Sequence, residues 1–179
     1  HKPDQSVAIL VRGRSHLKTI VPALRAANLN WQAIDITPLA SRMPVVDMLS
    51  LTRALLSPAD QISWLAVLRA PFCGLTLADL LVVSNSTSNN PKQGDAVLAQ
   101  LLRFSSTESE PLNDLSPEGQ KILCRVIPVL LDAWKNRGRK NIRDSIEQLW
   151  LELGGPDSLM ASSDLDDVRA YLDLLDNWQ

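Results

Sequence analysis

The stretch "WLAVLRAPFCGLTLADLL", residues 64–81, decides the fold class that the sequence predicts. Its first half places apolar residues at helical spacing, the pattern breaks at Pro71 and Gly74, and a second helical pattern follows Thr76. Thr76 can cap this second helix, and Asp79 three residues later completes an approximate capping box. The stretch therefore predicts two helices joined by a tight hairpin.

Helical spacing continues on both sides of this hairpin. Residues 45–56 form a helical pattern, and Ser57 is expected to cap the next helix with Pro58 at its first position. Gly138 and Gly154 are credible helix stops. The remaining helices are predicted at residues 95–104, 117–136, 141–153 and 164–178.

The N-terminal part has a different pattern. Val7–Val11 is a continuous apolar run rich in β-branched residues, which predicts a buried strand. Ser15 is expected to cap the helix that follows, and Trp31–Ile36 resembles a second short strand. We therefore predict a mainly α fold, with a small β-α-β piece at residues 1–36 and a helical body at residues 37–179.

Composition limits the classes of partner and compartment. A net charge of −2 excludes a polycation, so any contact with nucleic acid requires a local basic patch. Cys73 and Cys124 lie far apart without CxxC spacing, so the sequence predicts neither a disulfide framework nor a metal site. A cytoplasmic setting fits these cysteines best, and no signal peptide or membrane-spanning run is visible.

The sequence offers no catalytic constellation. His1 and His16 lack a Ser, Asp or Cys partner at a recognisable spacing, and His16 is expected to be a solvated surface residue. No GxxxxGK[ST] phosphate loop occurs. Most of the aspartates of residues 162–176 are expected on a solvated helix face. The polypeptide alone is therefore predicted not to be an enzyme, and it needs no cofactor of its own.

A basic cluster is the first feature that favours nucleic acid. In "WKNRGRKNIR", residues 134–143, Lys135, Arg137, Arg139 and Lys140 crowd a predicted helix–Gly–helix junction. Such cations can neutralise backbone phosphates without reading bases. The alternative is a solvated turn whose cations balance a helix dipole.

The hairpin at Cys73, Gly74, Leu75 and Thr76 is the second such feature. A helix-hairpin-helix element can meet DNA phosphate through the backbone N–H groups of its hairpin and of its second helix. The alternative is an ordinary corner between two helices.

A third turn, where Arg12 and Arg14 flank Gly13, follows the first predicted strand. Free N–H groups at the start of a helix, together with guanidinium groups, can hold a phosphate. The alternative is a solvated strand end.

Taken in order, several segments resemble the UvrD/RecB family of superfamily 1 DNA helicases, over about residues 6–84. Residues 7–35 resemble the strand and helix of motif IV, and residues 65–80 resemble the family's Gly-containing hairpin and Thr-capped helix. The segment between them matches a family spacing in which an Arg is followed by an Asp, two apolar residues and a second Arg. In this chain these residues are Arg42, Asp47, Leu49, Leu51 and Arg53. Residues 149–159 and 164–176 resemble the RecB/AddA, exonuclease V beta-type branch less specifically.

The resemblance implies that the chain is a fragment of an ATP-dependent DNA helicase of recombination and repair. Residues 1–36 would belong to the second motor domain, where Arg12 would reach the γ-phosphate of ATP. Residues 37–179 would form the helical 2B-type subdomain, whose hairpin contacts duplex DNA. The parent would bind ATP and Mg, whereas the fragment lacks Walker and nuclease motifs.

Two departures and one rival function accompany this resemblance. The family usually has a Gly-x-Gly hairpin preceded by a basic residue, whereas this chain has Phe72-Cys73-Gly74-Leu75. The rival function is a protein-interaction module that docks a partner subunit of a RecBCD- or AddAB-like complex. An inert spacer that limits motor opening is a third interpretation.

Overall fold

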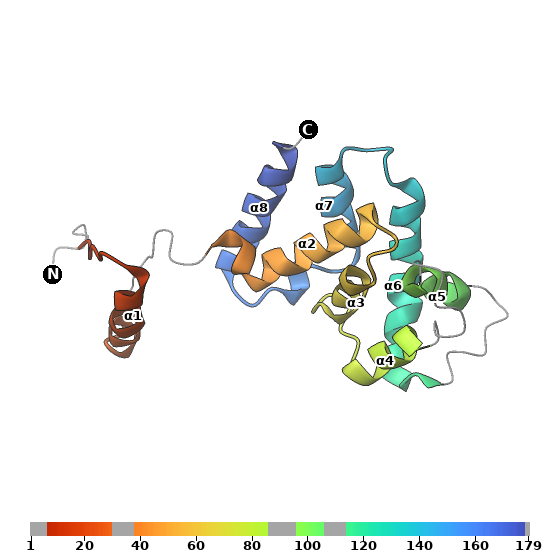
Figure 1. The fold of residues 1–179 in the computed structure, drawn as a ribbon, viewed down its shortest axis with the longest axis horizontal. Coiled ribbons are helices and arrows are strands. Elements are labelled where there is room, and N and C mark those ends of the chain that lie inside the picture. The colour runs from red at the N-terminus through yellow and green to blue at the C-terminus, as the bar shows by residue number, and fades with distance from the viewer. Residues whose placement is uncertain (1–6, 30–37, 86–95, 106–113, 178–179) are drawn as a thin grey trace. The chain divides into compact units, whose positions relative to one another are not determined.

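The computed structural model describes residues 7–29, 38–85, 96–105 and 114–177 (Figure 1). The chain divides into two compact units, His1–Pro38 and Leu39–Gln179. This division falls close to the boundary expected after residue 36. The two units are described separately below.

The first unit contains a 3₁₀ turn, η1 (Arg14–His16), and one helix, α1 (Leu17–Ala26). The predicted strand at Val7–Val11 is wrong: these residues form no strand, and the side chain of Leu10 is 95% exposed. A strand requires a neighbour that pairs with its N–H and C=O groups, and the described residues supply none. The predicted second strand, Trp31–Ile36, lies outside the described residues.

The start of α1 also differs from the prediction. His16, not Ser15, occupies the N-cap position, and its side chain makes no capping hydrogen bond. Pro22 lies inside the helix, as the sequence indicates. No residue of α1 is buried.

The second unit is helical, which confirms the mainly α prediction (Figure 1). The predicted helices in residues 95–178 are confirmed to within one or two residues at each end. In chain order the elements are η2 (Leu39–Ser41), α2 (Met43–Leu56), α3 (Gln61–Arg69), α4 (Leu77–Asn85), α5 (Ala96–Ser105), α6 (Pro117–Asn136), α7 (Ile142–Glu152), η4 (Pro156–Ser158) and α8 (Ser162–Asp176).

The corner between α2 and α3 shows why one predicted cap is wrong. Ser57 ends α2, and Asp60 caps α3. The Asp60 carboxylate accepts hydrogen bonds from both the backbone N–H and the hydroxyl of Ser63, at 3.0 and 2.7 Å. These bonds lower the pKa of Asp60 below its usual value. A carboxylate with two donors is therefore the cap at this corner.

Two other helix termini follow the sequence signals. Ser116 caps α6 and accepts a hydrogen bond from the backbone N–H of Gly119 at 2.9 Å. Gly154, at a φ of 80°, ends α7 in a Schellman motif: its N–H donates to Leu151, and the next N–H donates to Trp150. These caps satisfy backbone groups that the helices leave unpaired.

The core of the second unit takes buried residues from every helix from α2 to α8, and within it α2 packs against α3, α7 and α8. Two polar contacts tie α8 to α2. Tyr171 donates a hydrogen bond to the Thr52 hydroxyl at 2.8 Å inside the core. Arg42 donates to both carboxylate oxygens of Asp167 at 2.8 Å. Asp167 is therefore an exception among the aspartates of this helix, most of which the sequence predicts to be solvated. Among the helices that the structure describes, none combines the length and apolar character of a membrane span.

Candidate nucleic-acid interface

The basic junction, defined here as Lys135–Lys140, consists of the end of α6 and the turn that leads to α7. Helix α6 ends at Asn136, and Gly138 adopts a φ of 80° that turns the chain. Asn141 then caps α7, because its side chain accepts a hydrogen bond from the backbone N–H of Asp144 at 2.7 Å. The last turn of α6 and the short turn after it therefore carry the four predicted cations, all of them exposed.

Arg137 is held by the protein itself. Its guanidinium lies over the indole of Trp134, 4.4 Å from the ring centroid. The same group donates a hydrogen bond to the Trp134 carbonyl at 2.7 Å, near the C-terminus of α6. The cation thus lies where it stabilises the helix dipole, as the alternative interpretation of this turn expects.

Lys140 also has an internal partner. Its ammonium donates to the side-chain carbonyl of Gln148 at 2.6 Å, and the Gln148 amide donates to Glu152 at 2.7 Å. These three hydrogen-bonded side chains line a pocket of about 120 Å³ between α6 and α7. Asp132 adds a second carboxylate to the lining of this pocket. Two carboxylates in the lining make the pocket a poor place for a phosphate.

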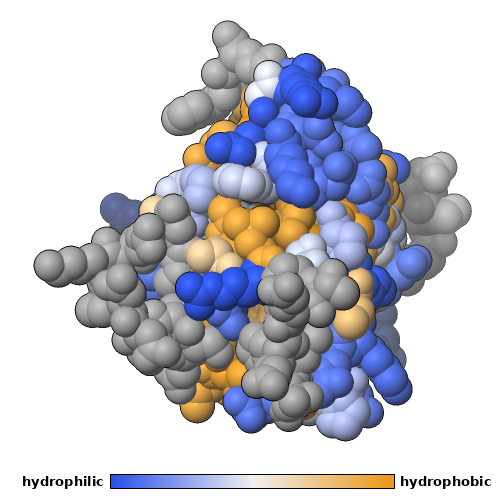
Figure 2. All heavy atoms as spheres, turned by 90° about the vertical axis from the view of Figure 1, so that its right-hand side faces the viewer, coloured by the Kyte–Doolittle hydropathy of each residue, from blue (hydrophilic) through white to orange (hydrophobic). Residues whose placement is uncertain are grey.

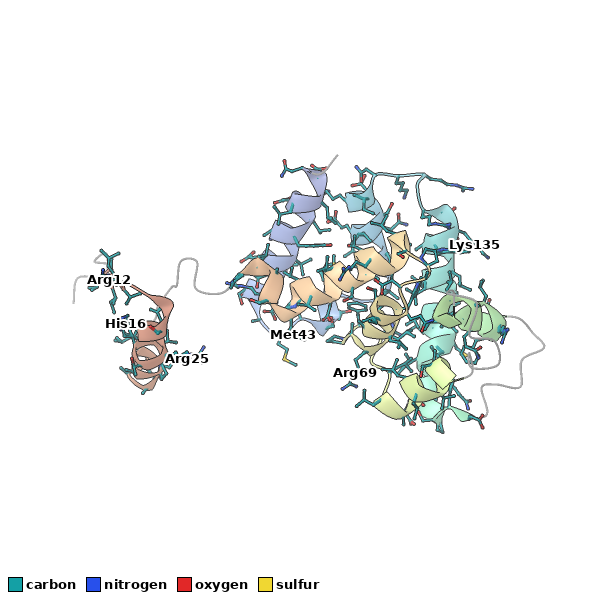
Figure 3. All side chains as sticks on the ribbon, in the orientation of Figure 1. Arg12, His16, Arg25, Met43, Arg69 and Lys135 are labelled. Atoms are coloured by element: carbon teal, nitrogen blue, oxygen red, sulfur yellow. The ribbon has the colours of Figure 1, made fainter. Side chains whose placement is uncertain are left out.

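Lys135 and Arg139 differ from these two cations. Both are exposed, and in the part of the chain that the structure describes neither side chain has a hydrogen-bond or ion-pair partner. Lys135 lies on the last turn of α6, as its label in Figure 3 shows. The next cation along the chain, Arg143, forms an ion pair with Glu147 at 3.2 Å, so its charge is neutralised within α7.

The molecular surface around the α6–α7 turn is polar. Figure 2 shows the face at the right-hand side of Figure 1, where α5 and α6 lie. Hydrophilic residues cover its upper part, at the height of the α6–α7 turn in Figure 1, and an apolar area lies below them. The basic junction is therefore part of a polar end of the helical unit.

The hairpin between α3 and α4 has the tight turn that the sequence predicts, but three of the four backbone donors of Cys73–Thr76 are occupied. The N–H groups of Cys73 and Gly74 both donate to the Ala70 carbonyl, at 2.9 and 2.8 Å. The N–H of Leu75 donates to Leu68 at 3.0 Å. Cys73 and Leu75 are buried, and burial raises the pKa of the Cys73 thiol to about 12. These three backbone N–H groups are therefore not free for a phosphate.

Two arginines that the sequence analysis missed hold this hairpin. Arg125, on α6, donates to the carbonyls of Phe72 at 2.9 Å and Leu153 at 3.1 Å. Arg69 donates to the Leu75 carbonyl at 3.3 Å. No local sequence pattern marks Arg125, because its partners lie far away in the chain. This geometry favours the interpretation of the hairpin as a corner between two helices.

Thr76, the last predicted hairpin residue, is exposed and belongs to a polar cluster around the buried Asp79. Its hydroxyl donates to the Asp79 carboxylate at 2.7 Å and accepts from the Asp79 N–H at 3.2 Å. Asp79 also accepts from the N–H and the hydroxyl of Ser116, at the start of α6. Since α6 has 20 residues and rises about 1.5 Å per residue, this cluster and the basic junction lie about 30 Å apart. The structure does not bring the two predicted DNA contacts together.

Arg12 belongs to the first unit. It is exposed and directly precedes the turn that leads into α1, where Figure 3 labels it near His16. His16 is exposed, as predicted. The described part of Val7–Val11 forms no strand end for Arg12, so its proposed phosphate contact has no geometry within this chain.

The described residues contain no group of three or more His, Cys, Asp or Glu side chains placed to hold a metal ion. The comparisons with protein-family models, with curated proteins and with solved structures found no match for this chain.

Proposed function

We propose that this chain is part of an ATP-dependent DNA helicase of recombination and repair, similar to the UvrD/RecB family and acting in the cytoplasm. In this proposal the helical unit, Leu39–Gln179, holds the DNA backbone without sequence preference, and the basic junction makes the contact. ATP and Mg would bind elsewhere in the parent protein, where Arg12 would reach the γ-phosphate.

The observation that carries the proposal is the basic junction itself. Four exposed cations lie within six residues, at the end of α6 and in the turn after it, in a chain whose net charge is −2. The turn is fixed by a positive-φ glycine and by the Asn141 cap, so little conformational entropy is lost when a phosphate binds. Because three of the four backbone donors of Cys73–Thr76 are occupied, we assign the DNA contact to the junction rather than to the hairpin.

The direct test is the anisotropy of a labelled duplex with a single-stranded overhang, titrated with the full chain over a salt series. We expect binding that weakens as salt increases, because released counterions drive phosphate contacts. Arg139→Glu/Lys140→Glu should abolish binding. The matched control, Lys121→Glu/Arg169→Glu, makes the same change of charge at exposed positions on α6 and α8 and should bind almost as wild type. Equal losses in both variants would contradict a local site.

A specific observation supports the rival function, a module that docks a partner subunit. Helix α4 is apolar around most of its circumference, and Leu77 and Leu81 lie exposed one turn apart. An apolar helix face exposed in one chain is typical of a surface that another chain covers. If wild type fails to bind DNA at low salt, and Leu77→Ser/Leu81→Ser abolishes capture of a partner subunit, the docking function replaces the DNA contact.

A further inference from the structure

The four cations of the basic junction are not equivalent in their surroundings. Arg137 and Lys140 each donate to an acceptor of the protein, at 2.7 and 2.6 Å. Lys135 and Arg139 have no side-chain partner among the described residues. A phosphate must compete with the existing partners of the first pair, whereas the second pair offers all its donors.

We infer that Lys135 and Arg139 are the phosphate ligands of the junction, and that Arg137 is a positioning residue that acts through Trp134. This inference rests on the proposed function and makes it more specific, because the ligand becomes two phosphates of a nucleic-acid backbone. Neither ligand reads a base, so duplexes of different sequence should bind alike.

The role of Arg137 follows from the rigidity of the residue beneath it. Trp134 packs against the core, and its indole N–H is buried without a hydrogen-bond partner among the described residues. The ring is therefore held by packing and offers a fixed plane. A planar guanidinium stacks on that plane and reaches the Trp134 carbonyl at the same time. This double contact fixes the chain just before Gly138, and Arg139 follows directly after that glycine.

The salt dependence of binding measures the number of phosphates. Each phosphate contact on duplex DNA contributes about −0.9 to the slope of log K against log salt, so two contacts predict a wild-type slope of about −2. Lys135→Ala and Arg139→Ala should each reduce the magnitude of this slope by about 1.

Charge-conserving variants separate a ligand from a positioning residue. Arg139→Lys keeps a cation that can contact phosphate, so its affinity should stay within about twofold of wild type. Arg137→Lys keeps the charge but loses the planar stack and the fork of donors. We expect its affinity to fall about two- to fivefold, the usual size of an exposed cation–π contact, with the salt slope unchanged. A merely structural loss would lower the thermal midpoint, which circular dichroism of each variant measures.

The outcomes distinguish this inference from the proposed function. If wild type does not bind the duplex at low salt, the proposed function fails and the inference fails with it. If wild type binds but Lys135→Ala and Arg139→Ala keep its slope, only the assignment of ligands is overturned. If Arg137→Lys binds as wild type does, its charge alone matters and the positioning role is overturned.

Discussion

Asp79 is a carboxylate buried where two helices begin, with 2% of its surface exposed. It lies in the first turn of α4 and accepts two hydrogen bonds from the cap of α6. A Cβ atom on Gly119 would lie 2.7 Å from the carboxylate carbon, so this close approach requires glycine. One side chain thus joins two helix N-termini, where the helix dipoles favour a negative charge.

This arrangement determines the pH dependence of the Asp79 contribution to stability. Burial acts to raise its pKa, but the hydrogen bonds from Thr76 and Ser116 together outweigh burial and lower the pKa below 3.8. A lowered pKa gives stability that is present above pH 3.8 and is lost as the pH falls through the folded-state value. We expect Asp79→Asn to lower the free energy of unfolding at pH 7 by about 2–3 kcal/mol, because an amide mispairs with these donors. Urea denaturation measures this, and a difference from wild type that persists unchanged below the folded-state pKa would contradict the account.

Asp47 is the opposite case. This half-buried carboxylate on α2 has no hydrogen-bond or ion-pair partner among the described residues, and burial raises its pKa to about 6. A raised pKa gives stability that is complete below pH 3.8 and is lost as the pH rises through about 6. Asp47→Asn should therefore stabilise the protein at pH 7 by about 1–2 kcal/mol, allowing for solvent screening at a half-buried site. Thermal melts at pH 7 and pH 4 test this, and no gain at pH 7 would contradict it.

At the scale of elements, helix ends decide where the turns of the candidate site lie. Two of the glycines that follow helices, Gly138 after α6 and Gly155 after α7, have different constraints. Gly138 has a φ of 80° with open space around its Cα, so an added Cβ costs only backbone strain. A Cβ on Gly155 would overlap the indole of Trp150, which is 4% exposed and fixed in the core. Gly138 is therefore needed for its backbone conformation, whereas Gly155 is needed for the close packing of Trp150.

This contrast predicts a difference between two alanine substitutions. Gly138→Ala should lower the free energy of unfolding by about 1–2 kcal/mol, the usual cost of a left-handed residue with a side chain. Gly155→Ala should cost more, about 2–4 kcal/mol, because Trp150 must move against a close-packed core. Chemical denaturation of both variants gives the comparison. If Gly155→Ala lowers the free energy of unfolding less than Gly138→Ala does, the inference that Trp150 packs closely on Gly155 is wrong.

The sequence predicted elements better than it predicted contacts. Caps such as Ser116 and stops such as Gly154 were found because their signal is local and their partners lie within a few residues. Ser57 was mistaken for a cap because Asp60, three residues on, competes for the same role. Arg125 was missed because it bonds carbonyls far away in the chain, which no periodicity reveals.

At the scale of the whole molecule, all the buried apolar residues among the described positions belong to the second unit. The strand prediction for Val7–Val11 failed for a related reason. An apolar run predicts burial only where a sheet is present to receive it, and the described chain contains no second strand. Of the candidate site, the sequence found the cations of the junction, but it could not show which of them the protein already holds.

This distribution of the core predicts that the second unit folds alone. A chain of residues 39–179 should unfold cooperatively at the same thermal midpoint as the full chain, because the deletion removes no described core residue. Differential scanning calorimetry of both chains checks the prediction. A clearly lower midpoint in the shorter chain would show that the first unit contributes to its stability.

The most direct test of the account is a measurement of which residues change when DNA is added. A titration of the ¹⁵N-labelled full chain with a short duplex at low salt, followed by amide chemical shifts, reports each candidate contact separately. The account predicts that the largest changes occur at Lys135–Lys140 and at the start of α7, with little change at Cys73–Thr76. Changes concentrated at the hairpin, or none at the junction, would contradict it.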